Sequence, residues 1–120
     1  MNLTSLAVIK ELLTKRGLKP LKGLGQNFIV DAKVLEKVVT SADLGAKDTV
    51  LEIGPGIGTL TQELAQKAGR VIAVEKDREM VEILRETLKG FENIDVVQDD
   101  ILRFDLPKLR LMFGGRTSQY

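Results

Sequence analysis

The sequence contains no cysteine, no histidine and no tryptophan, and it has only one tyrosine. Without cysteine the chain has neither a disulfide nor a thiolate nucleophile, and without histidine it has no imidazole general base. The same two absences exclude most zinc and iron sites, because those metals are usually held by thiolate or imidazole groups. Any metal ion would need carboxylate ligands alone, so we expect a protein that works without a metal.

Long apolar runs are missing as well. No stretch approaches the roughly 20 apolar residues that cross a bilayer, and residues 1–9 lack the basic and apolar regions of a signal peptide. We therefore expect a cytoplasmic protein that makes no contact with a membrane. The remaining composition, with 43% apolar and 29% charged residues in 120, is ordinary for one compact globular domain.

Charge is distributed unevenly along the chain. The net charge of the whole sequence is only +1, whereas residues 1–30 carry a balance of +4. The charged residues of this basic arm are Lys10, Glu11, Lys15, Arg16, Lys19 and Lys22. A basic arm ahead of a mildly acidic body suits an anionic partner such as RNA. A solvated helix end and loop would give the same pattern, so charge alone leaves both interpretations open.

Two helices are predicted before any strand. The first begins at a cap on Thr4 or Ser5 and ends near Gly17, and the second begins at a cap on Asp31. Between them, we expect residues 18–30, which are rich in glycine and lysine, to form a loop. The apolar faces expected to be buried are Leu6, Ile9, Leu12 and Leu13 in the first helix, and Val34, Leu35, Val38, Val39 and Ala42 in the second.

From residue 49 onward, strands and helices alternate. Continuously apolar runs predict strands, and a period of three to four residues predicts the helices between them. The strands are expected at 49–53, 70–75 and 94–98, with helices at 59–68 and 77–90. Strands that are apolar on both sides indicate a mostly parallel sheet covered on both faces. We therefore predict an α/β fold with the order βαβαβ after two leading helices.

The first strand leads into a turn with three glycines, Gly54, Gly56 and Gly58. Glycine lets the backbone turn sharply and approach a ligand closely, and the following helix points free N–H groups at the same place. A dinucleotide fingerprint would carry its third glycine at position 59, where this chain has Thr59. The compressed spacing fits the methionine end of S-adenosylmethionine (SAM) better than a pyrophosphate.

Acidic residues follow the next two predicted strands. Glu75 ends one of them, where a carboxylate can accept hydrogen bonds from both ribose hydroxyls of an adenosyl group. Asp100 follows the other and could accept the adenine amino group, although the neighbouring Asp99 competes for this role. Ile101 offers an apolar wall and a backbone N–H to the adenine ring. Glu52, inside the first strand, is expected to hydrogen-bond the backbone of the turn.

Four stretches together resemble the KsgA-type ribosomal RNA adenine dimethyltransferases. They are L-G-Q-N-F-I-V-D (24–31), L-E-I-G-P-G-I-G-T-L-T (51–61), V-I-A-V-E-K-D (71–77) and V-V-Q-D-D-I-L (96–102), and the resemblance covers about residues 5–109. Relatives that methylate large-subunit RNA more often read E-I-G-x-G-K-G, so Pro55 and Ile57 favour the small-subunit branch. The resemblance implies the N-terminal part of a Rossmann-like SAM-dependent methyltransferase fold, with three to four mostly parallel strands flanked by helices. It also implies that SAM is the cofactor and that 16S-type small-subunit rRNA is the partner. The family transfers two methyl groups to N6 of each of two adjacent adenosines.

The resemblance also assigns roles to single residues. Asn27 and Ile29 would close over the methionine part of SAM, and Gly54 would line the turn. Glu75 would bind the ribose and Asp100 the adenine amino group. This family continues into an N-L-P-Y motif or a close variant, which holds the flipped target base. No N-x-P-Y is present in this chain, so no catalytic residue is assigned and we expect a fragment that is inactive alone.

Three parts of the chain are expected: a helix with a basic capping loop (1–30), a partial SAM-binding domain (31–109) and an atypical tail (110–120). A strand order of 3-2-1-4-5 would leave one edge of the first strand exposed without a fourth strand. We predict that residues 109–113 fill this edge, or that the chain self-associates along it. The alternative functions are a non-catalytic RNA-binding protein on a methyltransferase fold and, third, an NAD-type dinucleotide-binding domain.

Overall fold

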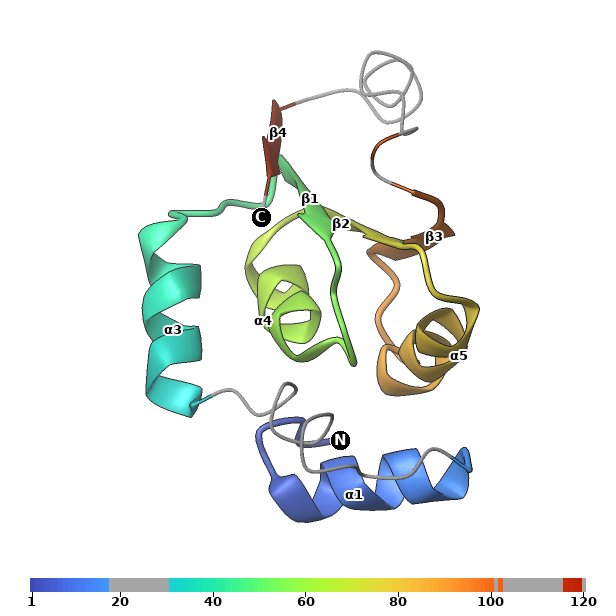
Figure 1. Cartoon of the computed structure of the whole chain (residues 1–120). Helices are drawn as coiled ribbons and strands as arrows, with labels where there is room; N and C mark the ends of the chain where they lie inside the picture. The colour runs from blue at the N-terminus through green and yellow to red at the C-terminus, as the bar shows by residue number, and fades with distance from the viewer. Residues whose placement is uncertain (18–30, 101, 103–115, 120) are drawn as a thin grey trace.

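The computed structural model describes residues 1–17, 31–100, 102 and 116–119 of the chain. Within these ranges helices and strands alternate after two leading helices, which confirms the predicted order (Figure 1). The elements are α1 (Leu6–Lys15), α3 (Ala32–Ser41), β1 (Asp48–Ile53), α4 (Thr59–Lys67), β2 (Arg70–Glu75), α5 (Arg78–Thr87), β3 (Ile94–Gln98) and β4 (Arg116–Gln119).

Short polar side chains fix where three of the helices begin. The Ser5 hydroxyl accepts a hydrogen bond from a backbone N–H of the first turn of α1. The carboxylates of Asp31 and Asp77 do the same for α3 and α5. Each of these oxygens satisfies one of the N–H groups that a helix leaves without an internal partner. The predicted caps are confirmed, with Ser5 chosen over Thr4.

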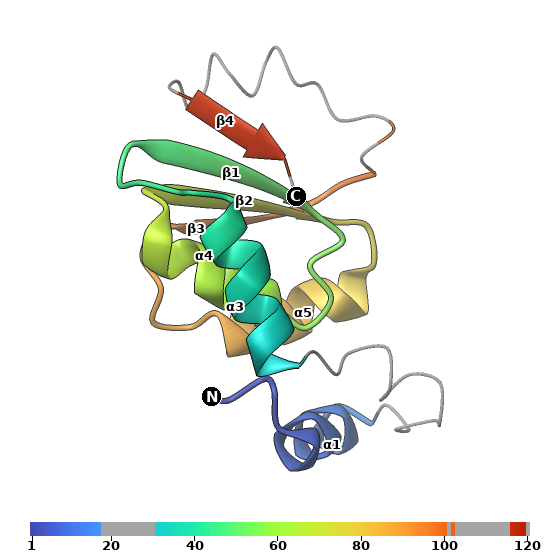
Figure 2. The same ribbon diagram turned by 90° about the vertical axis from the view of Figure 1, so that its left-hand side faces the viewer.

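The four strands form one parallel sheet with the order β3-β2-β1-β4, in which β1 and β2 are central. The predicted α/β, Rossmann-like class is confirmed by this arrangement. Among the described elements, α3, α4 and α5 all lie on one face of the sheet (Figures 1 and 2). Two right-handed crossovers that step in the same direction put their helices on the same face. The described helices therefore do not show the predicted cover on both faces.

The core is divided by the sheet. On the helix side, Val50 and Val71 pack with residues of α4, including Leu64. On the opposite side, Leu51 and Ile72 pack together in a second cluster and are 1% and 0% exposed. Both sides of the central strands are thus buried, as their continuously apolar sequence predicts.

A third cluster joins α1 to the rest of the molecule. Its members are Leu3, Ile9, Leu12, Leu13, Ile57 and Ile83. Ile57 comes from the Gly-rich turn and Ile83 from α5, so α1 packs against both of them. It lies on the side of the helix layer that faces away from the sheet (Figure 2).

Three residues predicted to be buried are exposed. Leu6, Val34 and Val38 are 43%, 54% and 38% exposed, respectively, so this part of the prediction is wrong. In α3 only Leu35 and Val39 reach the core, because the helix packs along one narrow row of side chains. The neighbouring row, rotated by about 100° in an ideal helix, faces outward.

The strand β4 lies at the edge of β1 and pairs with Asp48–Leu51 in parallel. A strand from the tail thus covers much of the edge that the strand order would otherwise expose. The segment predicted for this place, 109–113, lies outside the described residues, and the observed strand is Arg116–Gln119. Self-association of the chain stays a prediction. None of the described helices is long and apolar enough to cross a bilayer.

Candidate functional site: the carboxyl ends of three strands

The Gly-rich turn connects β1 to α4 and contains three left-handed glycines. Gly54, Gly56 and Gly58 have φ angles of +66°, +60° and +96°. Residues with a Cβ rarely adopt this conformation, so the turn requires glycine at these positions. A Cβ built on Gly54 would have no atom of the described residues within 4 Å, so this part of the chain leaves open space beside Gly54. The turn therefore offers room for a ligand next to its backbone.

Two buried side chains hold the ends of this turn. The Thr61 hydroxyl in α4 donates a hydrogen bond to the carboxylate of Glu52 in β1. The Thr87 hydroxyl in α5 donates one to the main-chain oxygen of Ile57 at 2.7 Å. Glu52 was expected to bond the loop backbone, and this prediction is wrong: its partner is a side chain of the following helix. The side chain of Glu52 points to the face of the sheet on which α4 packs.

Burial also changes the acidity of Glu52, which is only 3% exposed. Desolvation disfavours the charged form and raises the pKa of Glu52 from 4.5 to about 7, while the hydrogen bond from Thr61 acts in the opposite direction. A side chain buried in this way lies behind the turn and holds it in place.

The acidic residues predicted for ligand binding lie at the ends of β2 and β3. These strands are parallel and pair in register up to Glu75 and Gln98. The backbone N–H of Asp99 then donates to the main-chain oxygen of Glu75 at 3.0 Å, which extends the strand pairing by one residue. The N–H of Gly54 donates to the Val74 oxygen at 3.0 Å. Gly54, Glu75 and Asp99 therefore lie together at the carboxyl ends of three adjacent strands.

The side chains at this edge take part in short local hydrogen bonds. Glu75 accepts one from the N–H of Asp77 at 2.9 Å. Asp99 accepts one from the N–H of Asp100 at 2.7 Å, and Asp100 accepts one from the N–H of Leu102 at 3.0 Å. A carboxylate accepts up to about four hydrogen bonds, so each retains capacity for a ligand. Asp100 is half-buried, whereas Asp99 is exposed.

The structure thus brings Gly54, Gly56, Glu75 and Asp100 to one edge of the sheet. Three further predicted ligand-binding residues, Asn27, Ile29 and Ile101, lie outside the described residues. Within the described part of the chain, no group of three or more acidic side chains is placed to hold a metal ion.

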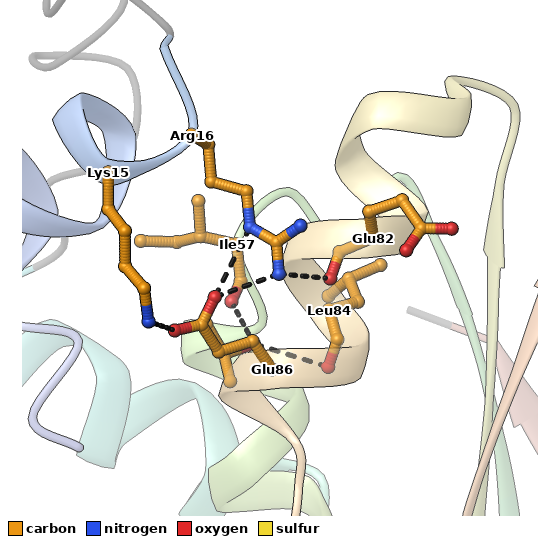
Figure 3. Close-up of polar contacts among 7 residues, drawn as sticks. Lys15, Arg16, Ile57, Glu82, Leu84 and Glu86 are labelled. Atoms are coloured by element: carbon orange, nitrogen blue, oxygen red, sulfur yellow. Dashed lines mark hydrogen bonds and ion pairs between the residues drawn. The ribbon is translucent and has the colours of Figure 1, made fainter.

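Ion pairs join α1 to α5 close to the turn (Figure 3). Glu86 accepts from the Lys15 ammonium at 3.0 Å and from the Arg16 guanidinium at 2.8 Å. The guanidinium also donates to the main-chain oxygen of Glu82 at 3.2 Å. These donors lower the pKa of Glu86. Two cations of the basic arm thus share one carboxylate of the same chain.

Sequence reasoning missed two residues that shape the site, Thr61 and Thr87. Both are threonines inside helices, 0% and 3% exposed, respectively. A threonine on the buried face of a helix resembles any other small residue in the sequence pattern. The acceptor of its hydroxyl lies on another element and is not a neighbour in the sequence. The bond of Thr61 could have been anticipated, because Glu52 is a charged residue in a mostly apolar strand and needs a polar partner. Thr61 lies about one helical turn after Gly58 and is close enough in sequence to supply it. Thr87 had no such signal.

Comparisons with known proteins agree with this geometry. The sequence profile of the family described as "Ribosomal RNA adenine dimethylase" matches residues 18–116. Ribosomal RNA small subunit methyltransferase A of Moorella thermoacetica is 50% identical over 105 residues, which cover 88% of this chain and 35% of the relative. The protein of the same name from Halothermothrix orenii is 46% identical over 95 residues, covering 79% and 32%. The chain spans about a third of the length of these curated relatives.

Two solved structures share the fold. The 23S rRNA methyltransferase ErmE is 41% identical with a TM-score of 0.62, and the match covers 65% of this chain and 32% of that one. A dimethyladenosine transferase from Plasmodium falciparum is 30% identical with a TM-score of 0.59, covering 64% and 29%. The family resemblance drawn from the four sequence stretches is confirmed, and the chain belongs to the ribosomal RNA adenine dimethylase family.

Proposed function

We propose that this chain is the SAM-binding part of a ribosomal RNA adenine N6-dimethyltransferase. One observation carries the proposal: a turn of three left-handed glycines lies at the same edge of the sheet as two acidic strand ends. In open α/β sheets, ligands bind at the carboxyl ends of the strands. Membership of the family supports SAM as the ligand.

The residues present fit an adenosyl group. The open space at Gly54 would take the methionine part, and the carboxylate of Glu75 would accept hydrogen bonds from the ribose hydroxyls. We assign the adenine amino group to Asp100 over Asp99, because Asp100 is half-buried and a less exposed carboxylate is better screened from water. Asn27 and Ile29 complete the proposed site by family resemblance, and Ile101 is added because it follows Asp100 directly in the sequence.

SAM would supply the methyl group, and the residues of this chain would bind and orient it. Catalysis in the whole enzyme would then rest on positioning, with a flipped adenine held in line with the methyl group. No protein nucleophile is needed for such a transfer, which suits a chain without cysteine or histidine. We propose small-subunit rRNA, at two adjacent adenosines, as the substrate of the whole enzyme, and the cytoplasm as its location. This chain, without an N-x-P-Y motif, is expected to bind SAM without transferring its methyl group.

Calorimetric titration with SAM and with NAD tests the proposal. We expect SAM to bind and NAD not to bind. Replacement of Glu75 by alanine should weaken SAM binding by about tenfold or more, since charge-assisted hydrogen bonds to the ribose are lost. Glu92→Ala is the matched control, because it removes the same charge from an exposed turn before β3. Equal SAM affinity in the Glu75 and Glu92 variants would refute the ribose assignment.

RNA binding without SAM is the second candidate, and an open groove between α1 and α5 favours it. Five cationic and three acidic side chains line this groove: Lys15, Arg16, Arg78, Glu79, Glu82, Arg85, Glu86 and Lys89. The excess of cations suits a phosphate backbone. Glu86 already offsets part of this charge through its ion pairs with Lys15 and Arg16. The groove therefore attracts phosphate groups less strongly than its number of cations suggests. RNA affinity that falls steeply with salt, together with no SAM affinity, would favour this candidate.

A further inference from the structure

Thr87, the last residue of α5, lies against the Gly-rich turn although 30 residues separate it from Ile57. Its hydroxyl donates a hydrogen bond to the main-chain oxygen of Ile57, and this bond is 2.7 Å long. The hydroxyl also lies 3.5 Å from the Leu84 oxygen, at the long limit for a hydrogen bond. Because a hydroxyl has one proton, the Ile57 oxygen is its acceptor.

This contact holds one peptide group at both of its ends. The carbonyl of the Ile57–Gly58 peptide accepts from Thr87, and its N–H, on Gly58, donates to the Pro55 oxygen at 3.0 Å. Both groups lie in a buried segment, where an unpaired backbone group is costly. Rotation of this peptide would break both bonds and change the φ of Gly58 from +96°. The pair of bonds therefore sets the shape of the turn.

Thr87 also reaches the other side of the turn. Its main-chain oxygen accepts from the side-chain amide of Gln62 at 2.8 Å, in the first turns of α4. The backbone N–H of Gln62 in turn donates to the Gly58 oxygen at 3.0 Å. The first N–H groups of α4 have no partner inside the helix, and Gly58 at the cap has no side chain to bind them. Their direction consequently depends on how Gly58 is held.

We propose that Thr87 is a positioning residue for the SAM site: by fixing the Ile57–Gly58 peptide and Gln62, it aims the turn at the cofactor without touching it. The inference rests on the proposed function. Thr87 is 3% exposed and lies behind the turn, whereas the open space lies beside Gly54.

Two substitutions at this position separate the hydrogen bond from packing. Thr87→Val keeps the shape of the side chain and removes the hydroxyl, which leaves the buried Ile57 oxygen without its donor. We expect SAM binding, measured by calorimetry, to weaken about tenfold. Thr87→Ser keeps the hydroxyl and removes a methyl group, and its affinity should stay within about a factor of two of the unchanged chain. Thr49→Val is the matched control, because this buried threonine lies at the opposite end of β1 and should leave affinity unchanged.

The opposite pattern, weak binding by the serine variant and normal binding by the valine variant, would show that Thr87 only fills space. If circular dichroism shows that Thr87→Val does not fold, Gln62→Met decides, since it removes the second contact from a partly exposed side chain. We expect about threefold weaker SAM binding there, and unchanged affinity would overturn the inference. Failure of the unaltered chain to bind SAM would overturn the proposed function as well. Normal SAM binding by both the unaltered chain and Thr87→Val would overturn only the role of Thr87.

Discussion

Gly58 and Gly90 make a matched pair for measuring how tightly the turn is packed. Their φ angles are +96° and +99°, so an alanine at either position suffers nearly the same backbone strain. Their surroundings differ. A Cβ at Gly90 would meet no atom of the residues that the structure describes within 4 Å, whereas a Cβ at Gly58 would lie 3.0 Å from Leu88 Cδ2 and from Thr87 Oγ1. The same Cβ would lie 3.2 Å from Leu84 Cδ2.

The expected cost follows from these distances. Left-handed strain for a residue with a Cβ is about 1–2 kcal/mol, which should be the whole effect of Gly90→Ala. At Gly58 the neighbouring side chains are buried and have no solvent to move into, so overpacking adds about 1–3 kcal/mol. Gly58→Ala should therefore destabilise the fold by about 2–5 kcal/mol, a large part of the ~5–15 kcal/mol that stabilises a typical domain.

Urea unfolding at neutral pH, with the free energy extrapolated to zero denaturant, measures both variants. Replacing glycine by alanine lowers the conformational entropy of the unfolded chain by the same amount in both variants, so this effect cancels in the comparison. Free energies of unfolding that agree within about 0.5 kcal/mol would refute the close approach of α5 to the turn, and with it the basis for the role of Thr87.

Two further predictions concern charge. Burial raises the pKa of Glu52 to about 7, so the folded chain holds this proton more tightly than the unfolded chain. The free energy of unfolding should thus fall by up to about 3 kcal/mol as pH rises from the unfolded pKa, about 4.5, through the folded one. Glu52→Gln should remove this decrease in stability between pH 5 and pH 8, which urea unfolding at the two pH values measures. An equal decrease in the variant would contradict the prediction. Glu86 has a lowered pKa, so its stabilisation is present at neutral pH and is lost as pH falls through the folded value. Glu86→Gln should cost about 0.5–1 kcal/mol at pH 7 and low salt, more than Glu82→Gln, which breaks an exposed pair with Arg85; equal costs would show that the link between α1 and α5 adds no stability.

Local features of the sequence were sufficient for the order of the elements up to β3 and for the limits of two of the strands. Caps such as Asp77 and glycines such as Gly54 act on their own neighbours in the chain, so their effects can be read without knowledge of the fold. The apolar runs of β2 and β3 were predicted with the boundaries that the structure shows. Parallel strands also place their carboxyl ends together, which is why Glu75 and Asp100 could be assigned to one edge in advance.

Contacts between distant parts of the chain could not be predicted in this way. Exposure of Val34 and Val38 depends on which neighbours reach α3, and a helical stripe does not state how wide its covered face is. The strand that pairs with β1 comes from 116–119. The sequence did not predict this segment, because edge pairing uses backbone groups that every sequence possesses and depends little on side-chain pattern.

The family, the parallel α/β order and the need for glycine in the turn could all be inferred from the amino-acid sequence, since each is encoded in contiguous residues or in strand ends that the topology brings together. The hydrogen bonds from Thr61 to Glu52 and from Thr87 to Ile57 became visible only in the folded molecule. These bonds join residues on different elements, and a hydroxyl finds its acceptor only after packing has fixed the distance and angle between them.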